Sequence, residues 1–226
     1  MAPLQPKMVK ELILEIKWIA FVILHKFRKQ IFMLKRLLVK PKLPANRDGE
    51  ILIHLGCGDI NSPEFINVDT HSAPHIHYLC DVTKLQSVFP DNYADLIYSC
   101  HVLEHIPVSE VKKTLYEWKG ILKPHGILRL SVPDFDKLIL VYNFSNKEIE
   151  SINGPLMGYD VGYGNHRGVF NRKYLTKLLI EVGFGEVVEW EPNGVAYHNF
   201  DDWASMPIDR YGKQFNISLN LEAKKV

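Results

Sequence analysis

The sequence contains little cysteine and, near its N-terminus, no apolar run of membrane-spanning length. Three cysteines in 226 residues are too few for a disulfide framework, so we expect a reducing compartment. The uncharged run at residues 18–24 is far shorter than the ~20 residues that a membrane-spanning helix needs. Glu11 and Glu15 interrupt the segment before it, and no small-residue cleavage site follows, which disfavours a signal peptide. These absences favour a cytoplasmic location.

The net charge of +1 conceals a separation of charge along the chain. Residues 1–49 contain 11 Lys and Arg against 3 Asp and Glu, whereas residues 50–226 contain 16 against 23. A basic head on an acidic body indicates that the head meets an anionic surface. The body has no basic stripe and no recognised nucleic-acid-binding motif, so we expect no nucleic acid partner.

Residues 7–40 are predicted to form one helix, because the segment is rich in helix formers and lacks Pro and Gly. Apolar residues from Leu12 to Leu38 fall on one face at helical spacing, and Lys and Arg fall on the other. Two readings stay open: a helix packed on its own domain or on a second copy, and a helix lying on the inner face of a membrane. The oligomeric state is therefore undetermined. The proline-containing segment 40–49 is predicted to be a linker, which gives domains at 1–46 and 47–226.

From residue 50 onward, short apolar runs alternate with helical patterns, which predicts a mostly parallel α/β sheet covered on both faces. In the helix predicted at 109–122, Ser109 is the expected N-cap and Pro124-His125-Gly126 the expected stop. The other helices are predicted at 135–142 and 172–182. The strands are predicted at 51–55, 65–68, 77–79, 96–99, 127–132, 186–190 and 217–221.

A glycine turn and a carboxylate stand close together after the first two strands. Gly56-Cys57-Gly58 follows the first strand directly, and Asp69 ends the next. Ligands of open parallel sheets bind at these strand ends, where glycines admit a ligand to the backbone and a carboxylate can accept both hydroxyls of a ribose. A nucleoside-bearing cofactor is therefore predicted. The third glycine and full helix of a dinucleotide fingerprint are missing, which disfavours NAD.

Four motifs in this order resemble the class I S-adenosylmethionine-dependent methyltransferases: "LGCG…FINVD", "CDVTKL", "DNYADLIYSCHVLEHI" and "LKPHGILRLSVPD". They resemble in particular the small methyltransferase type 11-like branch associated with polysaccharide biosynthesis. The resemblance covers about residues 50–140, and residues 166–184 resemble a later segment of that branch. It implies S-adenosylmethionine as cofactor. It also implies a Rossmann-like sheet of seven strands, the first five parallel and the last inserted antiparallel.

The same resemblance implies a set of cofactor-binding residues at four strand ends. The set comprises Leu55, Gly56, Cys57 and Gly58, then Asp69, then Asp81 and Val82, and finally Ser99, Cys100 and His101. The glycine turn would face the methionine part of the cofactor, and Asp69 would take the ribose hydroxyls. Asp81 would bind the adenine amine, with Val82 against the ring, although a helix start at "DVTKL" is an alternative role. The last three residues would line the floor near the methyl group.

Two departures from the pattern point to the subfamily. His54 stands where many relatives carry an acidic residue, and the helix after the glycine turn is nearly absent from the sequence.

Methyl transfer to a hydroxyl needs positioning and a base, and His is the side chain suited to that role near neutral pH. His101 and His166 are the predicted catalytic residues. His166 lies in a segment rich in Gly and Tyr, which is typical of lids and acceptor pockets, and the neighbouring Arg167 is a candidate for holding an anionic acceptor. The alternative for His166 is a side chain that faces solvent. His105, close to His101 after the fourth strand, is a further candidate, and its alternative is a purely structural role. Residues 198–212 are expected to form a pocket wall or a packing cover.

The histidines at positions 71, 75, 77, 101 and 105 have suggestive spacings, but no clear carboxylate or thiolate partners, so no metal is expected. The predicted function is methyl transfer to a small-molecule or glycan acceptor, most specifically a sugar hydroxyl of a surface glycan or its precursor. That acceptor rests on family analogy. The alternatives are a non-catalytic partner protein with the same fold, tethered through residues 7–40, and an NAD-dependent sugar oxidoreductase.

Overall fold

The computed structural model describes residues 42–44, 46, 48–159 and 164–226. The helix predicted over residues 7–40 lies outside the described residues, and the predicted domain division stays a prediction. The part from Leu43 to Val226 forms one compact unit. Within the described ranges, no helix combines the length and the apolar character that crossing a membrane requires.

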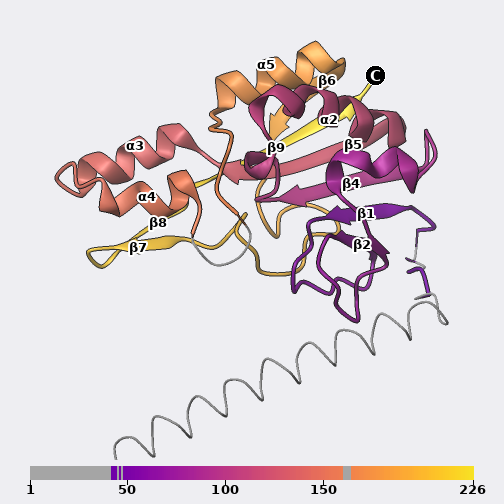
Figure 1. Ribbon diagram of the computed structural model, residues 1–226, viewed down its shortest axis with the longest axis horizontal. Coiled ribbons are helices and arrows are strands. Elements are labelled where there is room, and N and C mark those ends of the chain that lie inside the picture. Colours follow the sequence, from indigo (N-terminus) through magenta and orange to yellow (C-terminus); the bar gives the residue numbers. More distant parts are fainter. Residues whose placement is uncertain (1–41, 45, 47, 160–163) are drawn as a thin grey trace, which may run out of the picture. The chain divides into compact units, whose positions relative to one another are not determined.

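A seven-stranded sheet with the order β3-β2-β1-β4-β5-β9-β6 forms the centre of this unit (Figure 1). Neighbouring strands from β3 to β5 pair in parallel, whereas β9 pairs antiparallel with both β5 and β6. The predicted Rossmann-like sheet with an antiparallel last strand is confirmed. The strands are β1 (Leu52–Leu55), β2 (Phe65–Asp69), β3 (Tyr78–Leu79), β4 (Ala94–Cys100), β5 (Leu122–Pro133), β6 (Phe184–Glu189) and β9 (Ser218–Lys225).

The three predicted helices are present as α2 (Val108–Ile121), α3 (Phe135–Phe144) and α5 (Arg172–Val182). The expected N-cap of α2 is wrong. Pro107 occupies that position, and its carbonyl accepts hydrogen bonds from the backbone N–H groups of Glu110 and Val111. Ser109 therefore lies inside the first turn, because the fixed φ of proline suits an earlier helix start. The expected stop at residues 124–126 lies inside β5, where the pairing with β4 shifts register.

Alternate residues of the central strands face two different apolar clusters. In β1, Ile53 and Leu55 pack in the cluster that α2 and α5 cover, whereas Leu52 packs in the opposite one. The opposite face is covered by the segment that follows β6, which contributes Trp190 and Ala204 and contains no helix. Both faces are covered, as predicted, but the second cover is a loop.

Arg129 of β5 anchors this loop cover to the sheet. Its guanidinium donates hydrogen bonds to the Glu222 carboxylate at 2.5 Å and to the Ala196 carbonyl at 2.7 Å. The same group lies 5.4 Å from the centre of the Trp190 ring. Glu222 is the direct partner of Arg129 in the β5–β9 pairing, so the buried positive charge is neutralised within the sheet. The same guanidinium also binds the loop through Ala196.

The helix start considered at "DVTKL" is present as η1 (Val82–Ser87). Several other short elements were not predicted from sequence: η2 (Leu103–His105), α4 (Glu150–Met157) and the hairpin of β7 (Ile208–Arg210) and β8 (Lys213–Phe215). The Gly154-Pro155 pair of α4 is typical of a helix breaker. Helix α4 nevertheless forms beside α3 (Figure 1), and both contribute to a cluster that includes Ile208 of the hairpin. Tertiary packing rather than propensity stabilises so short a helix.

His54 of β1 is buried beneath the loop cover. Its side chain lies beside the rings of Tyr98 and Phe200, with ring centres 4.9 and 5.7 Å away. Its Nδ1 has no hydrogen-bond partner among the described residues. Burial lowers the pKa of His54 to about 4, against the smaller opposing effects of Asp202 and Asp69. The imidazole is therefore neutral at pH 7.

We expect the free energy of unfolding to fall as the pH is lowered from 6.5 toward 4. The folded-state pKa of His54 lies below its unfolded value of 6.5, so protons bind the unfolded chain first. Between pH 7 and pH 4.5, this group should cost about 2 kcal/mol of stability. Urea unfolding of the wild type and of His54→Phe at both pH values measures the difference. Equal losses in the two proteins would show that His54 is not responsible.

Candidate active site

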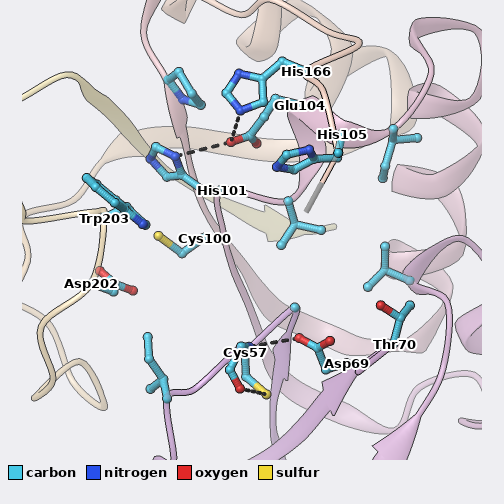
Figure 2. A pocket seen from close by; sticks show the side chains of 18 of the residues that line it. Cys57, Asp69, Thr70, Cys100, His101, Glu104, His105, His166, Asp202 and Trp203 are labelled. Carbon is cyan, nitrogen blue, oxygen red and sulfur yellow. Dashed lines mark hydrogen bonds and ion pairs between the residues drawn. The ribbon is translucent and has the colours of Figure 1, made fainter. Parts of the chain in front are cut away.

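A cavity of about 840 Å³ opens at the carboxyl ends of β1, β2 and β4 (Figure 2). Its volume lies in the range of ~300–1,000 Å³ that is typical of small-molecule sites. The carboxylate half of the cavity is defined by Gly56, Cys57, Gly58, Asp69 and Asp81. The histidine half is defined by His101, Glu104, His105 and His166. Figure 2 shows Cys57 and Asp69 at one end of the cavity and the histidine half at the other.

The glycine turn after β1 has a left-handed backbone at Gly56 and Gly58, with φ of 62° and 54°. A Cβ on Gly56 would lie 2.3 Å from Val102 Cγ2, so only glycine allows this packing. No atom lies within 4 Å of the place where a Gly58 Cβ would stand, and Gly58 lines the cavity. Between them, burial raises the pKa of the Cys57 thiol to about 12, so Cys57 stays protonated. A ligand in the cavity can therefore approach the backbone of the turn without meeting a side chain at Gly58.

The segment after the turn, residues 56–64, contains no helix. The near absence of a helix there was expected from the sequence, and the structure confirms it. A dinucleotide site would seat its pyrophosphate on a helix N-terminus at this place. The NAD-dependent alternative is disfavoured accordingly.

Asp69 ties the glycine turn to the end of β2. Its Oδ2 accepts the N–H of Gly58 at 2.9 Å, and its Oδ1 accepts the N–H of His71 at 2.7 Å. Each carboxylate oxygen accepts more than one hydrogen bond, so these contacts orient the group and leave capacity for ligand hydroxyls. Asp69 lines the cavity although it is only 7% exposed. This placement suits the ribose-binding role predicted for it.

Asp81 begins η1, two residues after β3 ends at Leu79. Its Oδ1 accepts hydrogen bonds from the N–H and the hydroxyl of Thr83, at 2.9 and 2.8 Å. Asp81 is therefore the N-cap of η1, as the alternative role predicted. Asp81 is also exposed and lines the cavity together with Val82. A helix-start carboxylate at the cavity is compatible with the predicted contact to an adenine amine.

The residues predicted at the end of β4 are divided between cavity and core. Cys100 and His101 line the cavity. Ser99 is buried and does not line it, and the same holds for Leu55, its direct partner in the β1–β4 pairing. Successive side chains of a strand point to opposite faces, so this pair faces the α2 side. Leu55 and Ser99 position the site from behind.

One ring nitrogen of His101 is hydrogen-bonded, and the other faces Glu104. The Ser218 hydroxyl donates to the Trp203 carbonyl at 2.6 Å, so its oxygen accepts the bond from His101 Nε2 at 2.8 Å. Burial lowers the pKa of His101 to about 3, which leaves the ring neutral with a lone pair on Nδ1. That lone pair lies 3.3 Å from Oε1 of Glu104. The predicted base role of His101 would require one of these contacts to open.

Glu104 of η2 lies at the centre of the histidine half (Figure 2). It is 1% exposed, and neither carboxylate oxygen has a hydrogen-bond partner among the described residues. His166 Nε2 lies 4.0 Å from Oε1, and the rings of His105 and His166 meet edge to face at 4.8 Å. Burial raises the pKa of Glu104 to about 8. A carboxyl group with so high a pKa is uncommon in proteins, and such groups occur mostly at functional sites.

Backbone hydrogen bonds bring the His166 segment to Glu104. The N–H groups of Arg167 and Gly168 donate to the Glu104 carbonyl at 2.6 and 3.0 Å, and the His166 N–H donates to the Met157 carbonyl at 2.9 Å. The His166 side chain is only 10% exposed, so the solvent-facing alternative is wrong. Arg167 is exposed and lines the cavity, where its predicted contact to an anionic acceptor stays a prediction.

Residues 201–206 form the opposite wall of the cavity, as predicted for the segment 198–212. Asp202 and Trp203 line it, and Asp202 accepts a short hydrogen bond from the Tyr98 hydroxyl. Sequence reasoning did not identify Glu104 or Asp202 as site residues. The available signal for Glu104 was its place between His101 and His105, which is equally typical of a packing pattern.

The histidines of residues 71–77 serve as hydrogen-bonding groups rather than as a cluster. His75 Nε2 donates to the Gly58 carbonyl at 2.8 Å, and His77 Nδ1 accepts the N–H of Asn67 at 2.9 Å. Glu104, His105 and His166 are the group with metal-ligand spacing among the residues that the structure describes.

The chain is similar to proteins that are described as methyltransferases. Residues 55–130 match the family described as Methyltransferase domain. A search of curated protein sequences found no match. A solved S-adenosylmethionine-dependent methyltransferase from Thermotoga maritima, described as a possible histamine N-methyltransferase, is 15% identical, covers 93% of this chain and 95% of its own, and has a TM-score of 0.51. Another solved S-adenosylmethionine-dependent methyltransferase, from Methanosarcina mazei, is 16% identical. The match covers 80% of this chain and 95% of that protein, with a TM-score of 0.50. At such identities these structures show a shared fold.

The matched family, the fold and the turn beside Asp69 together define a class of enzyme, the S-adenosylmethionine-dependent methyltransferases. The chain is an enzyme of this class, and its cofactor is S-adenosylmethionine. The matched residues, 55–130, run from the end of β1 into β5 and hold most of the carboxylate half.

The carboxylate half fits this cofactor. The open space at Gly58 admits a ligand to the backbone, and Asp69 presents an oriented carboxylate beside it. Asp81 and Val82 provide a further carboxylate and an apolar side chain along the same edge of the sheet. These are the groups predicted to bind the amino-acid, ribose and adenine parts of the cofactor, and all of them line the cavity.

Replacing Asp69 should weaken S-adenosylmethionine binding and leave the fold intact. Loss of charge-assisted hydrogen bonds to a ribose costs about 1.5–3 kcal/mol, roughly 10- to 100-fold in Kd. Asp69→Asn keeps an acceptor for the Gly58 N–H, so Asp69→Ala should have the larger effect. Calorimetric titration measures both, with Asp91→Asn, an exposed carboxylate outside the cavity, as the matched control. A folded Asp69→Ala protein with unchanged Kd would remove Asp69 from the site.

Proposed function

We propose that the enzyme methylates a hydroxyl group of a sugar or another small polyhydroxy acceptor in surface-glycan biosynthesis. The observation that carries this proposal is the histidine half, which places three imidazoles and a carboxyl group at the end of the cavity away from Asp69 (Figure 2). A hydroxyl acceptor needs such groups, because its proton must leave when the oxygen is methylated. The glycan context is supported by the resemblance of the sequence motifs to the polysaccharide-associated branch.

Aromatic side chains near the histidine half support a sugar acceptor. Trp203 and Tyr159 line the same cavity and are 44% and 46% exposed. An exposed ring packs on the apolar face of a sugar, while nearby polar side chains bind its hydroxyls. Asp201 and Arg167 line the cavity as well and supply such polar groups.

The two halves of the cavity divide the work of methyl transfer. S-adenosylmethionine, when bound, supplies a methyl group on a positively charged sulfur. The glycine turn and Asp69 hold and orient the cofactor. Burial lowers the pKa of His166, so its ring is neutral at pH 7 and available to accept the acceptor proton. His101 is held by Ser218 through Nε2, and its Nδ1 lies beside Glu104, next to His166.

Incubating the enzyme with methyl-labelled S-adenosylmethionine and glycan extracts should label a glycan or sugar precursor. His166→Ala should lower kcat by ~100- to 10,000-fold, the usual contribution of a positioned base, with cofactor Kd nearly unchanged. His125→Ala, an exposed histidine outside the cavity, is the matched control. Tight cofactor binding without transfer to any acceptor would instead favour the non-catalytic partner protein.

We also propose that residues 7–40 contact an anionic membrane surface from the cytoplasmic side. The support is the excess of Lys and Arg before residue 50 and the apolar face at helical spacing between Leu12 and Leu38. The matched methyltransferase residues begin at 55, beyond the proline-containing linker, so the head is separate in sequence from the chemistry.

A chain starting at Arg47 should fold and bind S-adenosylmethionine much like the full chain, but should not sediment with anionic vesicles. The full chain should sediment and be released as salt rises, because each Lys or Arg near the surface contributes about 1 kcal/mol and is screened by salt. Neutral vesicles are the control. If the shorter chain aggregates and the full chain ignores vesicles, the apolar face packs against protein.

A further inference from the structure

Glu104 is a buried carboxyl group to which the surrounding protein presents no proton donor. Its side chain is 1% exposed, and both oxygens lack a hydrogen-bond partner among the described residues. An isolated buried carboxylate costs several kcal/mol, and native proteins pair such groups or use them to bind metal ions. In its carboxylate form Glu104 therefore requires a cationic or proton-bearing partner.

The neighbouring histidines present lone pairs to Glu104 rather than protons. His101 donates its Nε2 proton to Ser218, so the Nδ1 atom at 3.3 Å from Glu104 Oε1 is an acceptor. His105 Nδ1 is buried and has no partner among the described residues. Ligand atoms of Glu104, His105 and His166 can be chosen within 4.8 Å of one another, a grouping of acceptors that suits a cation.

The rings of His105 and His166 also lie beside backbone groups. Burial lowers the pKa of both rings, and backbone groups oppose this effect, Asn165 at His105 and both Leu156 and Pro155 at His166. Histidines that bind metals donate their other N–H to a backbone carbonyl or carboxylate, which sets the tautomer and directs the free nitrogen at the ion.

We propose that Glu104, His105 and His166 bind a divalent metal ion of the zinc class. One donor atom from each side chain can be chosen so that all three lie within 4.8 Å of one another. Ligands of a tetrahedral ion with bonds of about 2.1 Å lie about 3.4 Å apart, so binding draws the three donor atoms together by up to about 1.4 Å. Two imidazoles and one carboxylate favour zinc or another late first-row metal over magnesium or calcium.

The site leaves room for a substrate atom on the ion. Three protein ligands are typical of catalytic zinc sites, in which the fourth position takes water or substrate. The three side chains line the cavity that holds the cofactor residues, so that position faces the acceptor space. This role rests on the proposed function: a coordinated hydroxyl releases its proton to solvent at a lower pH, and the resulting alkoxide oxygen is methylated, while His166 holds the ion instead of accepting the proton. The sequence-based expectation of no metal would be overturned.

Metal binding by the full chain, freed of metal by a chelator and dialysed, tests the site without an acceptor. Titration with Co²⁺ should give one equivalent with the visible absorption of a low-symmetry site, and Zn²⁺ should displace it. Glu104→Gln and His105→Ala should each weaken Co²⁺ binding by more than the ~10- to 100-fold that loss of a supporting contact costs. His125→Ala, exposed and outside the cavity, should bind like the wild type.

Thermal unfolding provides a second measurement if a variant fails to fold. The melting temperature of the metal-free wild type should rise with Co²⁺ concentration, because the ion binds only the folded chain. Glu104→Gln should be at least as stable as the wild type without metal and should not respond to Co²⁺.

Unchanged binding in Glu104→Gln, or no Co²⁺ effect on wild-type absorption and melting, would overturn the site and leave Glu104 as a protonated acid beside His101. Failure of the proposed function is a separate result: metal binds as expected, but no acceptor is labelled. Labelling that persists in the presence of chelator, together with absent metal binding, overturns the metal site alone.

Discussion

The pairing of β1 with β2 on one side and β4 on the other is the constraint on which the site depends. Parallel strands that start from the same end of a sheet also finish at the same edge, so the glycine turn, Asp69 and His101 emerge together. The hydrogen bond from the Gly58 N–H to Asp69 then joins two of these strand ends. Gly56 follows β1 and packs against Val102, which follows β4, so this contact joins the ends of those two strands.

The rest of the site is completed by chain that comes late in the sequence. Strand β9 enters between β5 and β6, and its first residue, Ser218, accepts the hydrogen bond from His101. Arg129 and Glu222, paired across β5 and β9, hold the loop cover that precedes the wall residue Trp203. The loop on the helix-free face of the sheet thus supplies a wall of the cavity, because a loop can place polar side chains where a helix would bury apolar ones.

Glu104 shows how stability and function are opposed at this place. Its backbone carbonyl accepts two hydrogen bonds from the segment after His166, which stabilises the fold, while its side chain is buried without a donor. A glutamine there would satisfy the packing at lower electrostatic cost. A residue that breaks a local rule of burial in an otherwise well-packed domain indicates a function that requires it.

The strands, the main helices and the glycine turn with Asp69 followed from the sequence alone, because each depends on periodicity or spacing within a short stretch. The same spacing predicted a nucleoside-bearing cofactor, and the family resemblance implied S-adenosylmethionine. The minor elements did not follow from the sequence, since α4 carries a Gly-Pro pair and forms only through packing on α3.

The environment of Glu104 could not be predicted from the sequence either. Whether a glutamate between two histidines packs inward or lines a cavity depends on which distant segments approach it. Here His166 reaches Glu104 through backbone hydrogen bonds, and Ser218 directs His101 through the insertion of β9. Only the tertiary structure could bring those segments together, because contacts between distant parts of a chain leave no local pattern.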